Sequence, residues 1–309
     1  MPPVDPRRVD TDAMTHPWRP EREITVAEAT AAVRGLGLAG DDVRQVAAGW
    51  DNSIVAVDHT WLFRFPRRSI ALPGVEREAL HLPRLAPLLP LPIPIPRHHG
   101  TYGEPPWPFW GAEVLPGTEL AVTPHADVES VAGALGRFVR ALHDVPLDPT
   151  LPVDPMGRAD AVDRAARTRV MLTDLRSAGV WRDDTALDAL LERADDAPPA
   201  PDQVVTSHGD LYARHVLVDD AGQACGVIDW GDLCVAHPGV DLAFVFSALA
   251  PQHRAAFWAE YGDVDDDTVL RARTMAAFSA AAVASYARDT RLDALLTSAL
   301  ERLATVAVD

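Results

Sequence analysis

The stretch Ser207–Asp232, which reads SHGDLYARHVLVDDAGQACGVIDWGD, constrains the fold of this 309-residue chain more than any other segment. It contains two short runs with strand character, HVLV at 215–218 and CGVI at 225–228, separated by the turn-forming sequence DDAG. Such runs on either side of such a turn predict a β-hairpin. We expect Val218 to pair with Cys225 across this hairpin.

The predicted hairpin gathers chemically active side chains at one of its ends. In this register His215 lies opposite Ile228, so one end of the ribbon holds Asp210, His215 and Asp229. One carboxylate there can orient a hydroxyl and accept its proton, and the other can hold Mg²⁺ on a phosphate. The alternative is that both aspartates are only turn residues. It is disfavoured because burying so many polar groups at one hairpin end is costly.

The N-terminal part of the chain predicts a small domain, residues 21–115, that follows a disordered leader at residues 1–20. Thr25 and Glu28 form a capping box that opens a helix ending near Gly35. Further expected elements are strands at 43–48, 53–58 and 60–66, a helix at 74–82, an extended proline-rich segment at 86–100, and a strand from 108 to the Pro-Gly break at 116–117. The three short strands indicate an antiparallel sheet.

Residues 116–309 predict a larger, mainly helical domain. Its strong strand signals are the hairpin and the preceding run QVVTS at 203–207. Helical spacing of apolar residues marks the segments 126–143, 158–178, 185–195, 240–249, 252–260 and 267–304. Together the two domains predict an α+β fold.

The charge of the chain argues against a nucleic-acid partner, since the formal net charge is −17. Residues 116–309 carry 31 acidic residues against 16 arginines. This excess would attract a cationic small molecule, although a solvated acidic surface explains most of these residues.

The sequence indicates a cytoplasmic protein without a membrane partner. No apolar run is long enough to span a bilayer, and the N-terminus lacks the apolar core of a signal peptide. The two cysteines, Cys225 and Cys234, are too few for a disulfide scaffold and are not spaced for a zinc site. We expect a monomer or a homodimer.

The motifs HGDLYARHVLV, GVIDWGD and HPGVDLA resemble those of antibiotic phosphotransferases of the aminoglycoside and macrolide type, relatives of the eukaryotic protein kinases. The resemblance extends over nearly the whole chain after the leader and implies a bilobal protein-kinase-like fold. It implies that Asp210 is the catalytic base or positions the hydroxyl, that Asp229 holds magnesium, and that Asp241 braces the catalytic loop. His208 would be a structural member of that loop.

His215 stands where the commoner kinase pattern has an asparagine that holds a second Mg²⁺. Magnesium prefers oxygen ligands, so an imidazole is a poor replacement. His215 would coordinate a metal weakly, donate to a phosphate oxygen, or leave one metal site weakened. The form HGDLYxxHVL is nevertheless similar to that of macrolide phosphotransferases, which makes His215 the mark of a subgroup.

The resemblance also implies a nucleotide donor, ATP or GTP, whose phosphates meet a cation from a central strand. The strand WLFRFP offers Arg64 for this role, since all 28 basic residues of the chain are arginines. A guanidinium binds two phosphate oxygens at once and stays charged when partly buried. On the following helix Glu78 falls within the apolar arc of Val75, Ala79 and Leu82, so it is the expected partner of Arg64. The alternative is an ordinary interior ion pair.

Two further segments are expected to contact the nucleotide. The turn AAGWDNSIV stands where related enzymes cover the phosphates, and Ser53 or the backbone near Asn52 is expected to contact phosphate. It has one glycine where the kinase loop has three, which makes it a weak signal. The nucleotide base is expected to bind backbone groups of Glu113, Val114 and Leu115.

The acceptor implied by the resemblance is a hydroxyl-bearing antibiotic. Acidic residues of the helical domain, Asp232 and Glu260 among them, would bind amino groups, whereas Trp181 and Tyr261, with Trp258 and Phe278, would line a pocket for a large apolar ring. A nucleoside or peptide antibiotic, choline or homoserine is also compatible with these residues.

Two other classes of protein fit part of the pattern. A metallophosphoesterase would use His208, Asp210, His215 and Asp229 on two metals, but it leaves Arg64 and Glu78 unexplained. A nucleotide-binding pseudokinase is favoured by the weak glycine turn, by Arg64 and by His215, but the presence of both Asp210 and Asp229 disfavours it.

Overall fold

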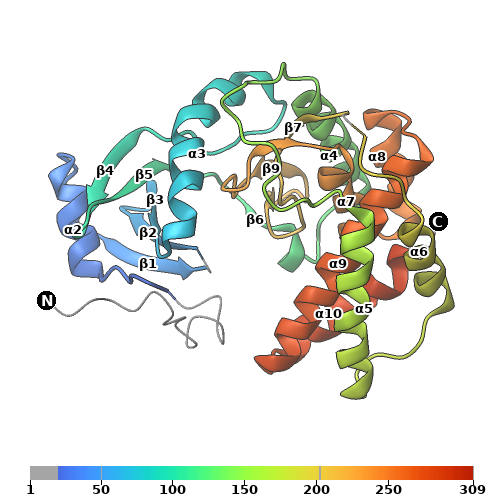
Figure 1. Ribbon diagram of the computed structural model, residues 1–309. Coiled ribbons are helices and arrows are strands. Elements are labelled where there is room, and N and C mark those ends of the chain that lie inside the picture. Colours follow the sequence, from blue (N-terminus) through green and yellow to red (C-terminus); the bar gives the residue numbers. More distant parts are fainter. Residues whose placement is uncertain (1–19, 50, 202, 309) are drawn as a thin grey trace, which may run out of the picture. The chain divides into compact units, whose positions relative to one another are not determined.

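The computed structural model describes residues 20–49, 51–201 and 203–308 of the chain (Figure 1). The expected leader therefore lies outside the described residues, apart from its last position. The chain forms two compact units: the first comprises residues up to Pro83 together with 94–114, and the second comprises 84–93 and the chain from Leu115 onward.

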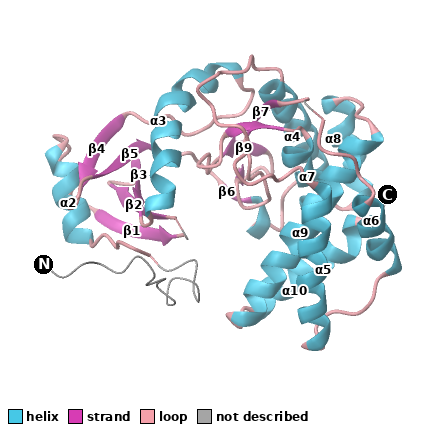
Figure 2. Ribbon diagram, in the orientation of Figure 1, coloured by secondary structure: helices cyan, strands magenta, loops and turns pink. Residues whose placement is uncertain are grey.

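The first unit is built on a five-stranded antiparallel sheet with the order β1-β2-β3-β5-β4 (Figure 2). The strands are β1 (Val43–Ala48), β2 (Asn52–Val57), β3 (Trp61–Pro66), β4 (His98–Tyr102) and β5 (Trp107–Glu113), and the helices are α2 (Val26–Gly35) and α3 (Leu72–Leu85). The predicted capping box is present at the start of α2, where Thr25 and Glu28 bond reciprocally.

Strand β4 was missed by the sequence prediction, which expected an extended proline-rich segment through residue 100. Its sequence, HHGTY, has no alternation of apolar residues, and it is a strand because it pairs antiparallel with β5. Before it, Ala86–Leu88 forms a short 3₁₀ turn.

Aromatic side chains form the core of the first unit. Phe63 and Phe65 on β3 are fully buried, and Phe109 on β5 is 2% exposed. The rings of Phe65 and Phe109 stack with centroids 4.5 Å apart. This packing fixes β3, the strand that carries Arg64, between β2 and β5.

The second unit is mainly helical and also holds a three-stranded sheet with the order β6-β8-β9 and a two-stranded sheet of β7 and β10. Its helices are α4 (Val128–His143), α5 (Ala161–Ser177), α6 (Thr185–Asp195), α7 (Gly239–Ala248), α8 (Arg254–Tyr261), α9 (Asp266–Asp289) and α10 (Asp293–Val306). Its strands are β6 (Thr118–Glu119), β7 (Val205–Ser207), β8 (Val216–Val218), β9 (Ala224–Val227) and β10 (Cys234–Ala236). The predicted α+β architecture is confirmed.

The predicted hairpin is formed by β8 and β9. Val216 pairs with Val227 and Leu217 with Gly226, as the predicted register requires. The backbone N–H of Ile228 donates to the carbonyl of His215 at 2.9 Å, which continues this register to the end of the hairpin opposite the turn. At the turn end the register shifts, so Val218 pairs with Ala224 instead of Cys225.

Helix α7 forms the centre of the second unit. Its residues 239–246 are all buried, including a carboxylate, Asp241. A helix that is apolar on every side can only be stable inside the core, so α7 fixes Asp241 at a defined position there. The segment 267–304 is divided into α9 and α10, with Arg291 in the left-handed backbone region between them.

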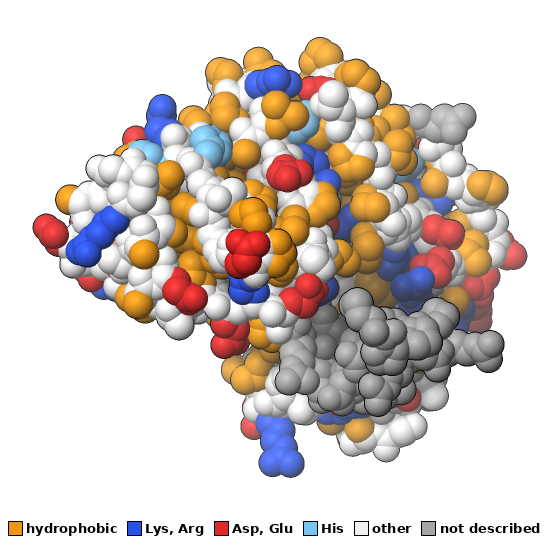
Figure 3. Space-filling view, turned by 60° about the vertical axis from the view of Figure 1, so that its left-hand side comes forward, with side chains coloured by type: hydrophobic (Ala, Val, Ile, Leu, Met, Phe, Trp, Pro, Cys, Tyr) orange, Lys and Arg blue, Asp and Glu red, His pale blue; other side chains and the backbone are white. Residues whose placement is uncertain are grey.

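No helix in the described part of the chain is both long and apolar enough to cross a membrane. On the face shown in Figure 3, acidic side chains are scattered among arginine and apolar side chains and do not gather in a single patch.

We expect that Phe63→Ala lowers the free energy of unfolding by about 3 to 5 kcal/mol, because it leaves a cavity in a packed aromatic core. Ile70→Ala is the control, since Ile70 is 68% exposed; it should cost less than about 0.5 kcal/mol. Urea unfolding followed by tryptophan fluorescence measures both. Equal stabilities of the two variants would contradict the assignment of this core.

Candidate active site

The end of the β8–β9 hairpin brings three predicted side chains together through His215. Its Nε2 lies 3.3 Å from Oδ2 of Asp229, and its Nδ1 lies 2.7 Å from the backbone oxygen of Asp210. The His215 side chain is 8% exposed, whereas those of Asp210 and Asp229 are 51% and 44% exposed. The imidazole is thus a buried link between two half-exposed carboxylates.

The hydrogen bonds of His215 indicate which nitrogen carries a proton. Nδ1 faces a carbonyl oxygen, which can only accept, so Nδ1 is protonated. Burial opposes a charged imidazole, but the hydrogen bond to Asp229 and its charge, together with Asp210, outweigh it and raise the pKa of His215. In the doubly protonated form Nε2 donates to Asp229 and has no lone pair for a metal.

Desolvation shifts the pKa values of the two other ionisable groups of this loop in opposite directions. The Asp210 side chain is 51% exposed, yet the packed residues around it partly desolvate its carboxyl and raise the pKa to about 7, against the opposing charge of His215. Full burial lowers the pKa of His208 to about 4, so this imidazole is neutral at neutral pH. Nε2 of His208 donates to the carbonyl of Ile228 at 3.0 Å, and Nδ1 accepts from the backbone N–H of Asp210 at 3.3 Å. His208 therefore ties the loop to the end of β9.

Asp229 has an unusual backbone conformation. Its φ is +64°, in the left-handed region that few residues other than glycine adopt. Aspartate tolerates this region better than most residues, and such conformations cluster at functional sites. The turn directs the Asp229 carboxylate toward His215.

Asp241 binds the backbone of this loop, which is the contact expected of a residue that braces it. Oδ2 of Asp241 accepts from the backbone N–H of His208 at 2.9 Å, and Oδ1 accepts from that of Gly209 at 3.0 Å. Nε2 of His143, on α4, lies 3.2 Å from Oδ2 of Asp241. All of these groups are buried, so one carboxylate sets the direction of the chain just before Asp210.

Asp232 lies beside the same loop and is paired with Arg158. Nη2 of Arg158 lies 2.5 Å from Oδ1 of Asp232, and its Nη1 lies 2.7 Å from Oδ1 of Asp154. Gly209 has φ +85°, and a Cβ there would lie 2.3 Å from the carbonyl oxygen of Asp232. Only glycine permits this close approach between the loop and the segment that follows Asp229.

The donor set at the hairpin end fits a magnesium ion that is shared with a nucleotide. Mg²⁺ is commonly bound by one or two carboxylates together with substrate phosphates, and Asp229 offers a half-exposed carboxylate. Within the described ranges, no three His, Cys, Asp or Glu side chains form a group that could hold a metal ion.

In the first unit the predicted pair of Arg64 and Glu78 is formed. Nη1 of Arg64 lies 3.1 Å from Oε1 of Glu78, and the carboxylate is only 1% exposed. The indole Nε1 of Trp110 donates to Oε2 of Glu78 at 3.2 Å. The side-chain amide of Asn52 fits this pair when its oxygen faces the guanidinium. In that orientation the oxygen accepts from Nη2 and Nε of Arg64 at 2.9 and 3.1 Å.

The other residues expected near the nucleotide are placed as follows. Ser53 is 2% exposed within β2, so its hydroxyl lies inside the first unit. Glu113 is exposed, with Oε1 3.7 Å from Nε of Arg97. The backbone N–H of Val114 donates to the carbonyl of Thr60 at 2.9 Å. Leu115 belongs to the second unit.

The side chains expected to bind the acceptor do not converge on one surface. Glu260 pairs with Arg137 at 2.6 Å on α4. Tyr261 is 5% exposed, and its hydroxyl lies 2.8 Å from Nδ1 of His143. Trp181 is half-buried, and its indole Nε1 has no hydrogen-bond partner among the described residues.

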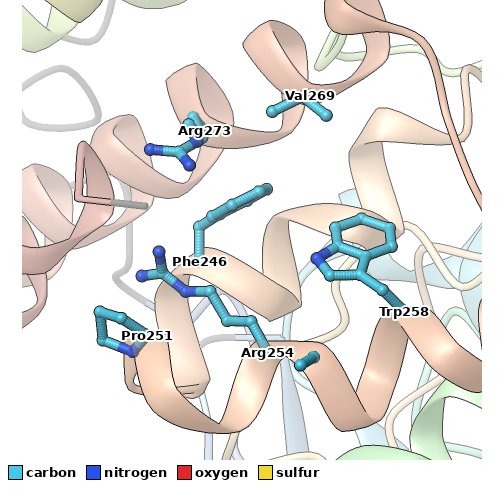
Figure 4. A pocket seen from close by; sticks show the side chains of 7 residues that line it. Phe246, Pro251, Arg254, Trp258, Val269 and Arg273 are labelled. Carbon is cyan, nitrogen blue, oxygen red and sulfur yellow. The ribbon is translucent and has the colours of Figure 1, made fainter.

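Trp258 lines a different hollow of the second unit, a cavity of about 370 Å³ (Figure 4). Phe246 lies between the guanidinium groups of Arg254 and Arg273, whose Cζ atoms are 5.1 and 4.6 Å from its ring centroid. Both arginines donate to the backbone carbonyl of Val308. None of the residues lining this cavity belongs to the hairpin end.

Sequence reasoning missed His143, Trp110 and Arg158, each of which holds a predicted residue in place. Each lies far along the chain from its partner, 98 residues for His143 and Asp241 and 74 for Arg158 and Asp232. The one local signal was chemical: a buried carboxylate such as Glu78 or Asp241 requires donors.

The motifs and their geometry agree with comparisons to known proteins. Residues 42–277 match the model of the phosphotransferase enzyme family, described as APH. The chain therefore belongs to this family and is a phosphotransferase.

Among its relatives is an aminoglycoside 3′-phosphotransferase of Streptomyces fradiae, 32% identical over 184 residues, which cover 55% of this chain and 67% of that protein. A macrolide 2′-phosphotransferase of type I is 25% identical in sequence and superposes with a TM-score of 0.62 over 92% of this chain and 99% of its own. These relatives confirm the resemblance to aminoglycoside and macrolide phosphotransferases that the sequence motifs indicated.

Two more distant solved structures share the fold. An APH(2″)-type enzyme in complex with GDP and kanamycin is 20% identical, with a TM-score of 0.68 over 89% of this chain and 96% of its own. A complex of another such enzyme with streptomycin and ATP is 13% identical, with a TM-score of 0.56 over 93% of this chain and 100% of its own. The protein-kinase-like fold expected from the motifs is confirmed.

We expect that Asp241→Asn lowers the free energy of unfolding by about 3 kcal/mol, because it removes a buried charge from a set of matched donors. Asp195→Asn is the control: Asp195 pairs with Arg169 at the surface, and its side chain is 46% exposed. That change should cost less than about 1 kcal/mol. Chemical denaturation measures both, and equal costs would contradict the bracing role of Asp241.

The stability difference between wild type and Asp241→Asn is also expected to depend on pH. Burial opposes ionisation of Asp241, but its hydrogen bonds with His143 and with the backbone N–H of Gly209 outweigh it and hold the pKa of the carboxyl below its ordinary value of 3.8. A carboxyl of this kind stabilises the fold above its unfolded-state pKa, and this stabilisation is lost as the pH falls through the folded-state pKa. The stability difference between wild type and Asp241→Asn should be constant above about pH 5 and shrink at lower pH.

Proposed function

We propose that this phosphotransferase moves the γ-phosphoryl group of ATP or GTP to a hydroxyl of an antibiotic of the aminoglycoside or macrolide type. The observation that carries the proposal is the hairpin end, where the buried His215 joins the half-exposed carboxylates of Asp210 and Asp229. This arrangement separates a group that handles the acceptor hydroxyl from a group that handles the phosphate.

Asp210 is the residue that orients the acceptor hydroxyl and accepts its proton. Its carboxylate is about half exposed, and the loop before it is held by Asp241 and His208. A pKa near 7 places Asp210 in the range where a general base is most effective at neutral pH.

Asp229 is the residue that would hold the magnesium ion. A bound Mg²⁺ would neutralise the negative charge that develops on the phosphate during transfer. His215 orients the Asp229 carboxylate by donating from Nε2, and it fixes the backbone of Asp210 by donating from Nδ1. His215 thus acts in this proposal as a positioning residue rather than as a metal ligand.

Arg64 is the residue that would bind the nucleotide phosphates. Glu78 and Asn52 hold its guanidinium from two sides, and the side chain is 12% exposed. A held guanidinium loses little conformational freedom when phosphate binds. Backbone groups of residues 113–115 are proposed to receive the nucleotide base.

The class of acceptor follows from the relatives and from charge. Structural neighbours of the same fold hold kanamycin with GDP, or streptomycin with ATP. The second unit of this chain has a large excess of acidic residues, which attracts cationic antibiotics. Nucleoside and peptide antibiotics, choline and homoserine remain the alternatives to be separated by experiment.

A mass-spectrometric screen tests the proposal. The protein with Mg²⁺ and ATP or GTP is offered kanamycin, streptomycin, a macrolide, nucleoside and peptide antibiotics, choline and homoserine. A mass increase of one phosphoryl group on an aminoglycoside or macrolide is expected. Phosphorylation of only another class would overturn the proposed acceptor.

We expect Asp210→Asn to lower kcat at least about 100-fold, because a positioned general base contributes about that much or more. Asp220→Asn is the matched control, since Asp220 is exposed in the turn of the same hairpin; its kcat should stay within about twofold. Steady-state transfer rates measure both. Undiminished transfer by Asp210→Asn would show that another group does this chemistry.

We expect Arg64→Ala to raise the KM for the nucleotide about tenfold, because a charge-assisted contact to phosphate is lost. Arg64→Lys should recover part of this loss, since lysine keeps the charge but not the planar fork. Arg44→Ala is the control, because Arg44 is an exposed residue of β1. A nucleotide KM that is the same in all three variants would rule out Arg64 as a phosphate ligand.

A further inference from the structure

A chain of buried hydrogen bonds runs from α8 to the catalytic loop. The hydroxyl of Tyr261, at the end of α8, lies 2.8 Å from Nδ1 of His143 on α4. Nε2 of His143 lies 3.2 Å from Oδ2 of Asp241 on α7, which accepts from the backbone N–H of His208. Tyr261, His143 and Asp241 are 5%, 5% and 0% exposed, so water does not compete for these bonds.

The direction of each hydrogen bond in this chain follows from its end at Asp241. Because Asp241 is an ionised carboxylate, which can only accept, Nε2 of His143 must carry the proton that it donates. In the neutral imidazole, Nδ1 then holds a lone pair, and the hydroxyl of Tyr261 donates to it. Burial raises the pKa of Tyr261 to about 12, so the hydroxyl keeps its proton at any pH where the enzyme works.

The contact between α8 and α4 depends on Gly136. A Cβ at Gly136 would lie 2.4 Å from the carbonyl oxygen of Phe257, so α8 approaches closely only because no side chain is there. At Gly133, one turn earlier on the same helix, the nearest atom to an added Cβ is 3.8 Å away. The guanidinium of Arg140 lies 5.1 Å from the ring centroid of Tyr261 and covers it from the α4 side.

We propose that Tyr261 is a positioning residue for phosphoryl transfer: its hydroxyl fixes the orientation of His143, which holds the Asp241 carboxylate against the backbone of the catalytic loop. This inference rests on the proposed role of Asp210, which follows directly after the residues that Asp241 binds. It also gives Tyr261 a different role from the acceptor contact expected from the sequence.

Loss of the Tyr261 hydroxyl changes the loop without touching a substrate. Nδ1 of His143 would be left without its hydrogen-bond partner in a buried place, so the imidazole would gain other orientations. The Asp241 carboxylate would then lose its fixed partner on α4, and the N–H groups of His208 and Gly209 would be held less firmly. The rate of the chemical step depends on the placement of Asp210 and is therefore reduced, whereas substrate binding is unchanged.

The first test is Tyr261→Phe, which keeps the ring and removes the hydroxyl. We expect kcat to fall about fivefold, the effect of one neutral hydrogen bond, with the KM for the nucleotide changed less than about twofold. Transfer from ATP or GTP to kanamycin and hydrolysis to water are both measured. Amide hydrogen exchange at residues 208–210, followed by mass spectrometry, should become faster.

A coupling test separates positioning from a merely structural contribution. His143→Leu removes both the acceptor for the hydroxyl of Tyr261 and the donor to Asp241, so Tyr261 can no longer act on the loop through this residue. In the His143→Leu background, Tyr261→Phe should therefore change kcat less than about 1.5-fold. An undiminished effect in that background would overturn the proposal.

The glycine pair on α4 is a third test with a matched control. Gly136→Ala should displace α8 and reduce kcat at least as much as Tyr261→Phe, whereas Gly133→Ala should keep full activity and equal or greater thermal stability. If Gly136→Ala fails to fold, the result from Tyr261→Phe stands alone.

The outcomes distinguish this inference from the proposed function. If Asp210→Asn is inactive but Tyr261→Phe has wild-type kcat and wild-type exchange at residues 208–210, the positioning role is wrong and the proposed function stands. If Tyr261→Phe raises only the KM for kanamycin, Tyr261 binds the acceptor and the inference also fails. If Asp210→Asn retains full transfer, the proposed function fails whatever Tyr261 does.

Discussion

The candidate site depends on one buried carboxylate, that of Asp241. Its two oxygens accept from the backbone N–H groups of His208 and Gly209, and they fix the direction in which the chain enters the loop that carries Asp210. A buried charge is stable only if donors surround it, and here the donors come from the loop itself and from His143. The stability of the core and the geometry of the loop are therefore set by the same bonds.

The hairpin shows how much of the structure can be predicted from local sequence patterns. The runs at 215–218 and 225–228 and the turn between them sufficed to predict which residues meet, because pairing in a hairpin is determined over a few residues. The prediction failed only at the turn end, where Val218 pairs with Ala224. That shift depends on the conformation of the turn, which the strand pattern does not contain. The helical arc of α3 likewise identified Glu78 as the buried acid.

The supporting residues could not be predicted in this way. His143 ends an amphipathic helix like many others, and only the packing of α4 against α7 and α8 brings it to Asp241. For the same reason Trp110 had no visible connection to Glu78 before the sheet was known. The acceptor residues were the weakest prediction, because exposed acids and aromatics occur throughout the helical unit. Tyr261 was expected to contact the acceptor, but it is buried and its hydroxyl contacts His143.

The pairing of Arg64 with Glu78 has a consequence for how this enzyme can be modified. The chain contains no lysine, so no side-chain amine is available at the candidate nucleotide site. A guanidinium stays protonated in proteins and is not a target of lysine acetylation. The positive charge proposed for phosphate binding is therefore permanent, whatever the acylation state of the cell.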